Sequence, residues 1–106
     1  MRRSLLHALF PIVRAEILRL LLTNRGQELY VRQLARLSFL SLHTVQEELA
    51  KLHAAHLVLS RTNGYHRFYR ANPKHPLYPG LRQVVIEAAS RPRPAIRTRQ
   101  RRAAKV

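Results

Sequence analysis

The chain has 106 residues, with 20 lysines and arginines, five acidic residues and no cysteine, so its formal net charge at pH 7 is +15. This length accommodates one domain, and the lack of cysteine excludes disulfides and thiolate chemistry. No stretch approaches the roughly 18 consecutive apolar residues that span a bilayer, and no nucleophile with its base is recognisable. We therefore expect a basic binding protein without a cofactor, neither an enzyme nor a membrane protein.

The first half of the chain predicts two helices and a short strand. Residues 5–23 have the apolar spacing of a long helix, which Pro11 interrupts near its beginning. Residues 24–26 read as a helix stop, and residues 28–30 as a short strand beside a later hairpin. Residues 31–40 repeat apolar side chains at helical spacing. The turn that follows is short, and Phe39 occupies a position where we expect a residue that tolerates positive φ.

The next segment predicts a helix and a β-hairpin. Ser41 is a favourable N-cap, and Val45, Leu49 and Leu52 repeat at helical spacing, which predicts a helix over residues 42–55. The pair Asn63-Gly64 lies between β-prone runs and predicts a hairpin over residues 57–70, because both residues accept positive φ. A two-residue turn there would place Leu59 opposite Phe68, and would turn both side chains toward the helices.

The C-terminal third predicts a connector, a last helix and a tail. Prolines at 73, 76 and 79 favour an extended connector, and residues 81–89 have the spacing of an amphipathic helix. The apolar surfaces of the first and last helices predict a homodimer, with packing of these helices within one chain as the alternative. Residues 91–106 hold seven basic and no acidic side chains, which predicts a disordered basic tail beyond a domain of residues 1–90.

Two short helices followed by a hairpin indicate a mainly α fold of the α+β class, the winged helix-turn-helix. Its second helix, here residues 42–55, enters the DNA major groove, and the wing, residues 57–70, reaches the adjacent minor groove or backbone. The candidate base readers are His43, Thr44, Gln46 and Glu47, of which Gln46 can bind adenine with two hydrogen bonds. Glu47 has a structural alternative, an ion pair with Lys51. The candidates for backbone or minor-groove contact are Arg32, Arg36, Lys51, Arg61, Asn63, Tyr65, His66 and Arg67.

Several runs, among them YVRQLARL, TVQEELAKL and FYRANPKHPLY, extend over roughly Leu9 to Val85. With these runs the chain resembles the small prokaryotic ArsR/MarR-like winged helix-turn-helix transcriptional regulators. The resemblance implies sequence-specific binding of double-stranded DNA by a homodimer, in the cytoplasm and associated with the nucleoid. It does not extend to the cysteine motif of the metal-sensing members, and relatives commonly carry a basic residue where Glu47 stands.

Other functions remain open at this point. A winged helix also serves as a protein-interaction module, which Glu47, Glu48 and the glycine-free turn favour, or as a non-specific, chromatin-like DNA binder. RNA binding lacks a visible aromatic stacking platform. His53 and His56 lie three residues apart near the end of one predicted helix, but two histidines alone make an incomplete metal site. The cationic run from Arg61 to Lys74, which contains no carboxylate, favours nucleic acid.

Overall fold

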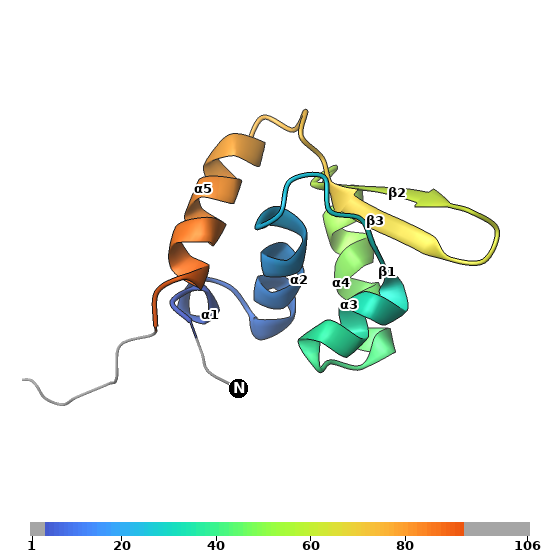
Figure 1. Ribbon diagram of the computed structural model, residues 1–106, viewed down its shortest axis with the longest axis horizontal. Coiled ribbons are helices and arrows are strands. Elements are labelled where there is room, and N and C mark those ends of the chain that lie inside the picture. Colours follow the sequence, from blue (N-terminus) through green and yellow to red (C-terminus); the bar gives the residue numbers. More distant parts are fainter. Residues whose placement is uncertain (1–3, 93–106) are drawn as a thin grey trace, which may run out of the picture.

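The computed structural model describes residues 4–92, which form an α+β fold of five helices and one three-stranded antiparallel sheet (Figure 1). The predicted tail beyond residue 92 lies outside the described residues. In chain order the elements are α1 (Leu6–Leu9), α2 (Ile12–Leu22), β1 (Leu29–Tyr30), α3 (Val31–Ser38), α4 (Leu42–Ala54), β2 (Val58–Thr62), β3 (Arg67–Ala71) and α5 (Tyr78–Ala89). Within residues 4–92, no helix has the length and apolar character that crossing a membrane requires.

The core forms where α2 lies between α5 and the pair α3 and α4 (Figure 1). Its fully buried side chains come from every helix and from the sheet. Among them are Leu6, Ile17, Leu34, Val45, Leu49, Val58 and Val85. Pro11 breaks the first helical stretch as expected, because α1 ends at Leu9 and Pro11 has extended ψ at the N-cap of α2.

The apolar stripe of α5 packs within the chain. Val85 and Ala88 are buried in the core, where α5 contacts α2 and α1. This is the intrachain alternative of the sequence analysis. Leu9 and Val84 still expose 55% and 44% of their surface, so apolar surface remains on both helices.

The turn between α3 and α4 has the backbone conformation that the sequence predicts. Phe39 adopts φ 59° and ψ 34° in the left-handed region and exposes 84% of its surface. The buried Ser38 hydroxyl donates to the Leu34 carbonyl (2.6 Å), which satisfies it inside the last turn of α3. Ser41 caps α4, because its hydroxyl accepts a hydrogen bond from the Thr44 amide (3.2 Å). These contacts therefore fix the short connection between α3 and α4.

The hairpin confirms the predicted strands but not the predicted register. Leu59 pairs with Arg70 and Thr62 with Arg67, so the pairing is displaced by two residues from the prediction. The Asn63 side-chain oxygen accepts from the amides of Tyr65 (3.0 Å) and His66 (2.9 Å). Asn63 thus precedes the turn, and Gly64, at φ +95°, takes its first central position. Positive φ at that position alone is the pattern of a type II′ hairpin turn.

The face of the sheet that meets the helices is the opposite of the predicted one. The register does not cause this difference, because a shift of two residues leaves each side chain on its own face. Val58, Tyr69 and Ala71 pack against the core, whereas Leu59 and Phe68 do not. The expectation that Leu59 and Phe68 cover the helices is therefore wrong. Phe68 instead joins Tyr30 and His66 on the outer face, where the rings of Tyr30 and His66 stack at 4.1 Å. The predicted strand β1 is confirmed, and it supplies Tyr30 to this cluster by pairing with β3.

The connector before α5 is turned rather than extended. The His75 amide donates to the Asn72 carbonyl (3.2 Å) and the Tyr78 amide to the His75 carbonyl (2.9 Å). Helix α5 therefore begins at Tyr78, earlier than predicted, with Pro79 in its first turn. Proline is tolerated there because the amides of the first turn have no partner inside the helix.

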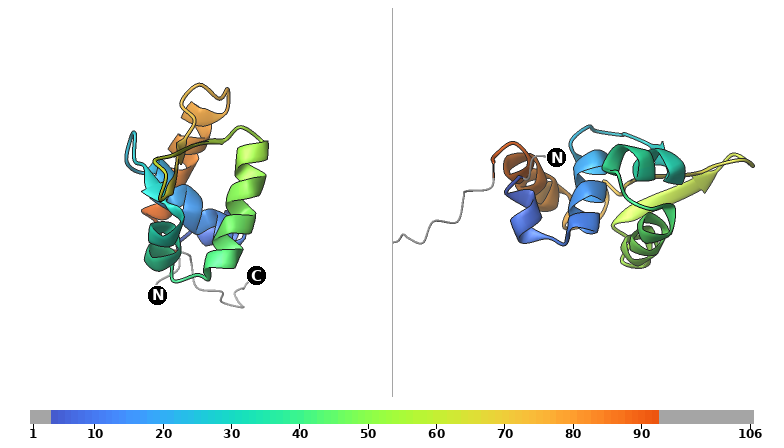
Figure 2. Two further views of the ribbon diagram at one scale, coloured as in Figure 1. Left: turned by 90° about the vertical axis from the view of Figure 1, so that its right-hand side faces the viewer. Right: turned by 90° about the horizontal axis from the view of Figure 1, so that it is seen from below.

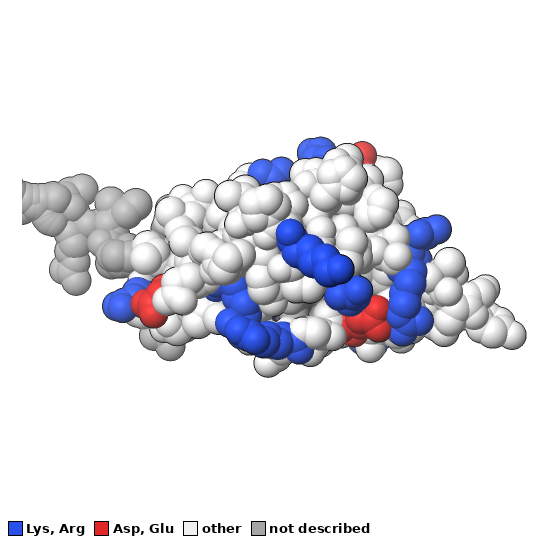
Figure 3. Space-filling view, turned by 90° about the horizontal axis from the view of Figure 1, so that it is seen from above, with Lys and Arg blue, Asp and Glu red and all other residues white. Residues whose placement is uncertain are grey.

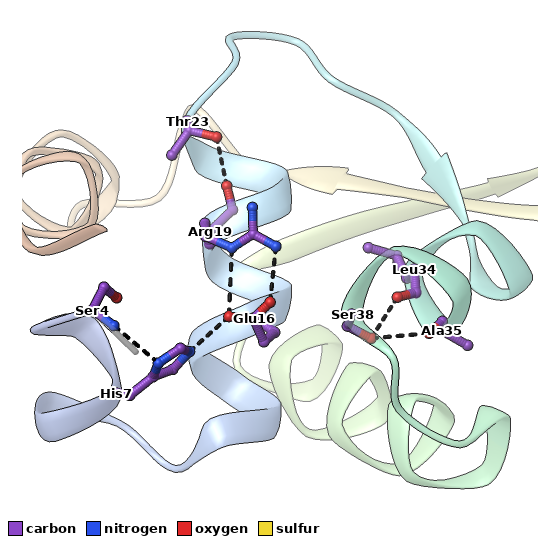
Figure 4. A network of polar contacts seen from close by, with 8 residues as sticks. All are labelled: Ser4, His7, Glu16, Arg19, Thr23, Leu34, Ala35 and Ser38. Atoms are coloured by element: carbon purple, nitrogen blue, oxygen red, sulfur yellow. Dashed lines mark hydrogen bonds and ion pairs between the residues drawn. The ribbon is translucent and has the colours of Figure 1, made fainter. Parts of the chain in front are cut away.

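A buried polar network joins α1 to α2 (Figure 4). The Glu16 side chain is 2% exposed; one carboxylate oxygen contacts His7 Nε2 (2.7 Å) and the other accepts from Arg19 (2.8 Å). Burial raises the pKa of Glu16, but the hydrogen bonds and charges of Arg19 and His7 outweigh it, so its pKa lies below the ordinary value. The network therefore holds an ionised carboxylate beside the core.

Candidate nucleic-acid interface

The outward face of α4 is set by its buried face. Val45, Glu48, Leu49 and Leu52 are buried, and these positions follow one side of the helix. The opposite side carries exposed residues in two rows: His43, Glu47, Ala50 and Ala54, and beside them Gln46 and His53. Ala50 and His53 were absent from the predicted readers, although the same helical spacing points to them. A small side chain such as Ala50 lets a partner approach the helix closely.

The predicted base readers differ in what their side chains already bind. The Thr44 hydroxyl lies 2.6 Å from the Ser41 hydroxyl, so Thr44 belongs to the helix cap. His43 Nε2 lies 3.3 Å from a Glu47 carboxylate oxygen, and this pair replaces the expected pairing of Glu47 with Lys51. Within residues 4–92 the Gln46 amide makes no side-chain hydrogen bond. Gln46 is therefore the predicted reader whose donors and acceptor are all available.

On the hairpin, three of the predicted contact residues bind within the chain. The Arg61 guanidinium forms two short hydrogen bonds to the Glu28 carboxylate (2.8 Å each) and lies 4.6 Å from the centre of the Phe68 ring. Asn63 is occupied by the turn, and His66 stacks on Tyr30. Arg61 is exposed, but its guanidinium is already bound to Glu28 and is not free for a DNA contact.

Tyr65 and Arg67 remain available at the end of the hairpin. Tyr65 is 93% exposed, and among the described residues the Arg67 guanidinium makes one hydrogen bond, to the Ser60 hydroxyl (3.2 Å). On α3, Arg32 and Arg36 are exposed one helical turn apart and make no ion pair within the described part of the chain. Viewed along the hairpin, α4 lies on one side of it and α3 with β1 on the other (Figure 2).

The ion pairs explain how the net charge is distributed. The five acidic residues of the chain are all glutamates, and each lies within 4.0 Å of a basic or histidine side chain. Glu28, which directly precedes β1, reaches Arg61 and Arg70, so the cationic run after residue 61 does have a carboxylate beside it. Basic side chains outnumber acidic ones on the face in Figure 3. Within residues 4–92 the cations that pair with no glutamate are Arg25, Arg32, Arg36, Lys51, Arg67, Lys74 and Arg82.

The ion pair between Glu28 and Arg61 also shifts the pKa values of both side chains. Hydrogen bonding from Arg61 lowers the pKa of the Glu28 carboxyl below its ordinary value, against an opposing effect of burial. Hydrogen bonding to Glu28 raises the pKa of Arg61 in turn. The pair is thus ionised at neutral pH and joins the residue before β1 to the hairpin.

The described residues offer fewer features that support metal binding or a protein-interaction role. Residues 4–92 contain no group of three or more histidine, cysteine or acidic side chains that could hold a metal ion, so His53 and His56 have no third ligand there. Glu48, which favoured a protein-interaction role, is buried and bound to Arg14 (2.6 Å). Comparisons with protein-family models, with curated proteins and with solved structures give no match. Function is therefore inferred from the residues and their geometry.

Proposed function

We propose that the protein binds double-stranded DNA as a winged helix-turn-helix transcriptional regulator, with α4 in the major groove and the β2–β3 hairpin as the wing. The observation that carries the proposal is the exposed face of α4, with Gln46 free and Ala50 beside it, next to cations that no glutamate neutralises. A capped helix with exposed polar side chains near its N-terminus is the element that such proteins insert into the groove.

The charge distribution supports DNA over an acidic protein partner. Arg32, Arg36, Lys51 and Arg67, which pair with no glutamate within residues 4–92, come from α3, α4 and the hairpin, the three elements that meet DNA in a winged helix. Phosphate contacts from such residues position the protein, whereas Gln46 supplies base discrimination. Because Arg61 and His66 bind within the chain, their role is to hold the hairpin in place beside α3.

The experiment compares two exposed amides that are converted to carboxylates. Gln46→Glu places a negative charge on the outward face of α4, and Asn24→Asp places the same charge on the exposed loop after α2. Both variants lower the net charge equally, so long-range attraction to DNA changes alike. Fluorescence anisotropy with a labelled duplex at low salt should show Gln46→Glu weakened at least about tenfold, because a base contact is lost and phosphate is repelled. Equal affinities of the two variants would exclude α4 as the DNA-contacting helix.

We also propose that two copies associate through α1 and α5. The supporting surface is a shallow apolar groove between these helices, with Leu5, Leu9, Val84 and Ala88 among its lining residues. Glu87 and Arg91 form an ion pair (3.1 Å) at its edge and carry opposite charges, so each could pair with the other's counterpart across a two-fold axis. Sedimentation analysis should show a dimer that Val84→Lys dissociates, and a monomeric parent chain would reject this arrangement.

A further inference from the structure

We propose that a cleft between α2, α4 and the start of α5 binds a small amphipathic carboxylate. The cleft has a volume of about 390 Å³, within the range of roughly 300 to 1,000 Å³ of small-molecule sites. Its walls are apolar and come from Phe10, Leu18, Leu52, Ala55, Leu57, Leu77 and Leu81. Leu77 exposes 62% of its surface at this site, so an apolar ligand would cover surface that water now contacts.

Two basic side chains line the same cleft and select the charge of the ligand. Arg14 donates one hydrogen bond, from Nε to Glu48 (2.6 Å), and its terminal Nη donors have no partner within residues 4–92. Lys51 lies on α4 one helical turn after Glu47, and it makes no ion pair among the described residues. With Arg14, Lys51 and Glu48 together, the polar edge carries one net positive charge. A single carboxylate fits that charge, whereas an ammonium group would be repelled.

The apolar walls determine the chemistry of the rest of the ligand. They offer no further charged group, so the site fits a hydrocarbon body joined to one carboxylate. Charge-assisted hydrogen bonds from Lys51 and Arg14 would hold the carboxylate, and they are stronger than bonds between neutral groups. Burial of the hydrocarbon against the leucine side chains supplies the larger, non-directional share of affinity.

The cleft shares Lys51 with the candidate DNA interface. A carboxylate that binds Lys51 withdraws this cation from phosphate, so ligand and DNA should oppose each other, and by linkage each should weaken the other equally. This coupling rests on the proposed function. Binding of the carboxylate to the cleft does not, because it requires only the free protein.

The test uses decanoate below its micellar concentration, with decanol and decyltrimethylammonium as neutral and cationic counterparts. Calorimetry on the full chain without DNA should give decanoate the highest affinity and the cation the lowest. Lys51→Met should weaken decanoate at least about tenfold and leave decanol nearly unchanged, since one charged hydrogen bond is lost. Lys74→Met, which removes an exposed lysine outside the cleft, is the matched control.

Two further measurements locate the site. Ala55→Trp should fill the cleft and abolish binding of decanoate and decanol alike, and thermal unfolding checks that the variant is folded. Methyl NMR shifts on titration should centre on Leu52, Leu57, Leu77 and Leu81. Equal affinity for decanoate and decanol, an unaffected Lys51→Met variant, or shifts confined to Leu9 and Val84 would overturn the assignment. Decanoate binding by a chain that binds no DNA would uphold the cleft while rejecting the proposed function.

Discussion

Two arginines of the hairpin should differ in their effect on DNA binding, because only one of them is free. Arg67 contacts a serine hydroxyl, whereas Arg61 is bound by Glu28 through two hydrogen bonds of 2.8 Å. Each phosphate contact contributes about 0.9 to the slope of log affinity against log salt concentration. Between roughly 50 and 200 mM salt, a fourfold change, one contact therefore accounts for about a 3.5-fold loss of affinity.

The assay is anisotropy of a labelled duplex at several salt concentrations, with Arg67→Gln and Arg61→Gln compared at equal net charge. Arg67→Gln should reduce the salt slope by about 0.9, because one released counterion is lost. Arg61→Gln should leave the slope within error of the parent and act through the position of the hairpin. Equal reductions by both variants would refute the conclusion that Glu28 keeps Arg61 from phosphate.

Three further predictions concern stability. Phe39→Gly should raise the free energy of unfolding by about 0.5 kcal/mol in urea titrations, because relief of the left-handed backbone exceeds the added flexibility of the unfolded glycine; Phe39→Ala, which keeps a Cβ, should show no gain. Since the pKa of Glu16 is lowered on folding, its stabilisation is complete above its ordinary pKa of 4.5 and disappears as the pH falls through the lower folded value. Glu16→Gln should therefore flatten the acid limb of stability against pH, and an unchanged limb would contradict this. Asn63→Ala should speed amide exchange at Tyr65 and His66, at a cost of about 1 kcal/mol; unchanged exchange would show that Gly64 alone sets the turn.

Local patterns predicted the elements because the physics that forms them is local. Helical spacing identified α2, α3 and α4, Ser41 marked the start of α4, and the short turn required positive φ at Phe39. The hairpin register could not be predicted in the same way. The Asn63 amide donates to the His66 carbonyl (3.2 Å) and its side chain accepts from the amides of Tyr65 and His66, so Gly64 and Tyr65 form the turn. The turn therefore moves by one residue and the pairing by two.

The sequence predicted which residues lie at the candidate site, but not which of their side chains are free of partners within the chain. The spacing of the apolar residues predicts which side of α4 is buried, and the residues on the opposite side then point outward. Whether a side chain is free depends on partners far along the chain. Glu28 and Arg61 are 33 residues apart, and Arg14 and Glu48 are 34 apart, so their ion pairs become visible only once β1, α2 and α4 are packed.

Cleavage of DNA from a single position on α4 tests the central proposal most directly. The chain contains no cysteine, so Gln46→Cys creates one thiol to which an iron chelate that cuts DNA can be attached. The same conjugate at Asn24→Cys, on the loop after α2, is the control. We predict discrete cuts in a bound duplex from position 46 and few from position 24. Equal cleavage from both positions, or none from position 46 while the duplex is bound, would contradict insertion of α4 into the major groove.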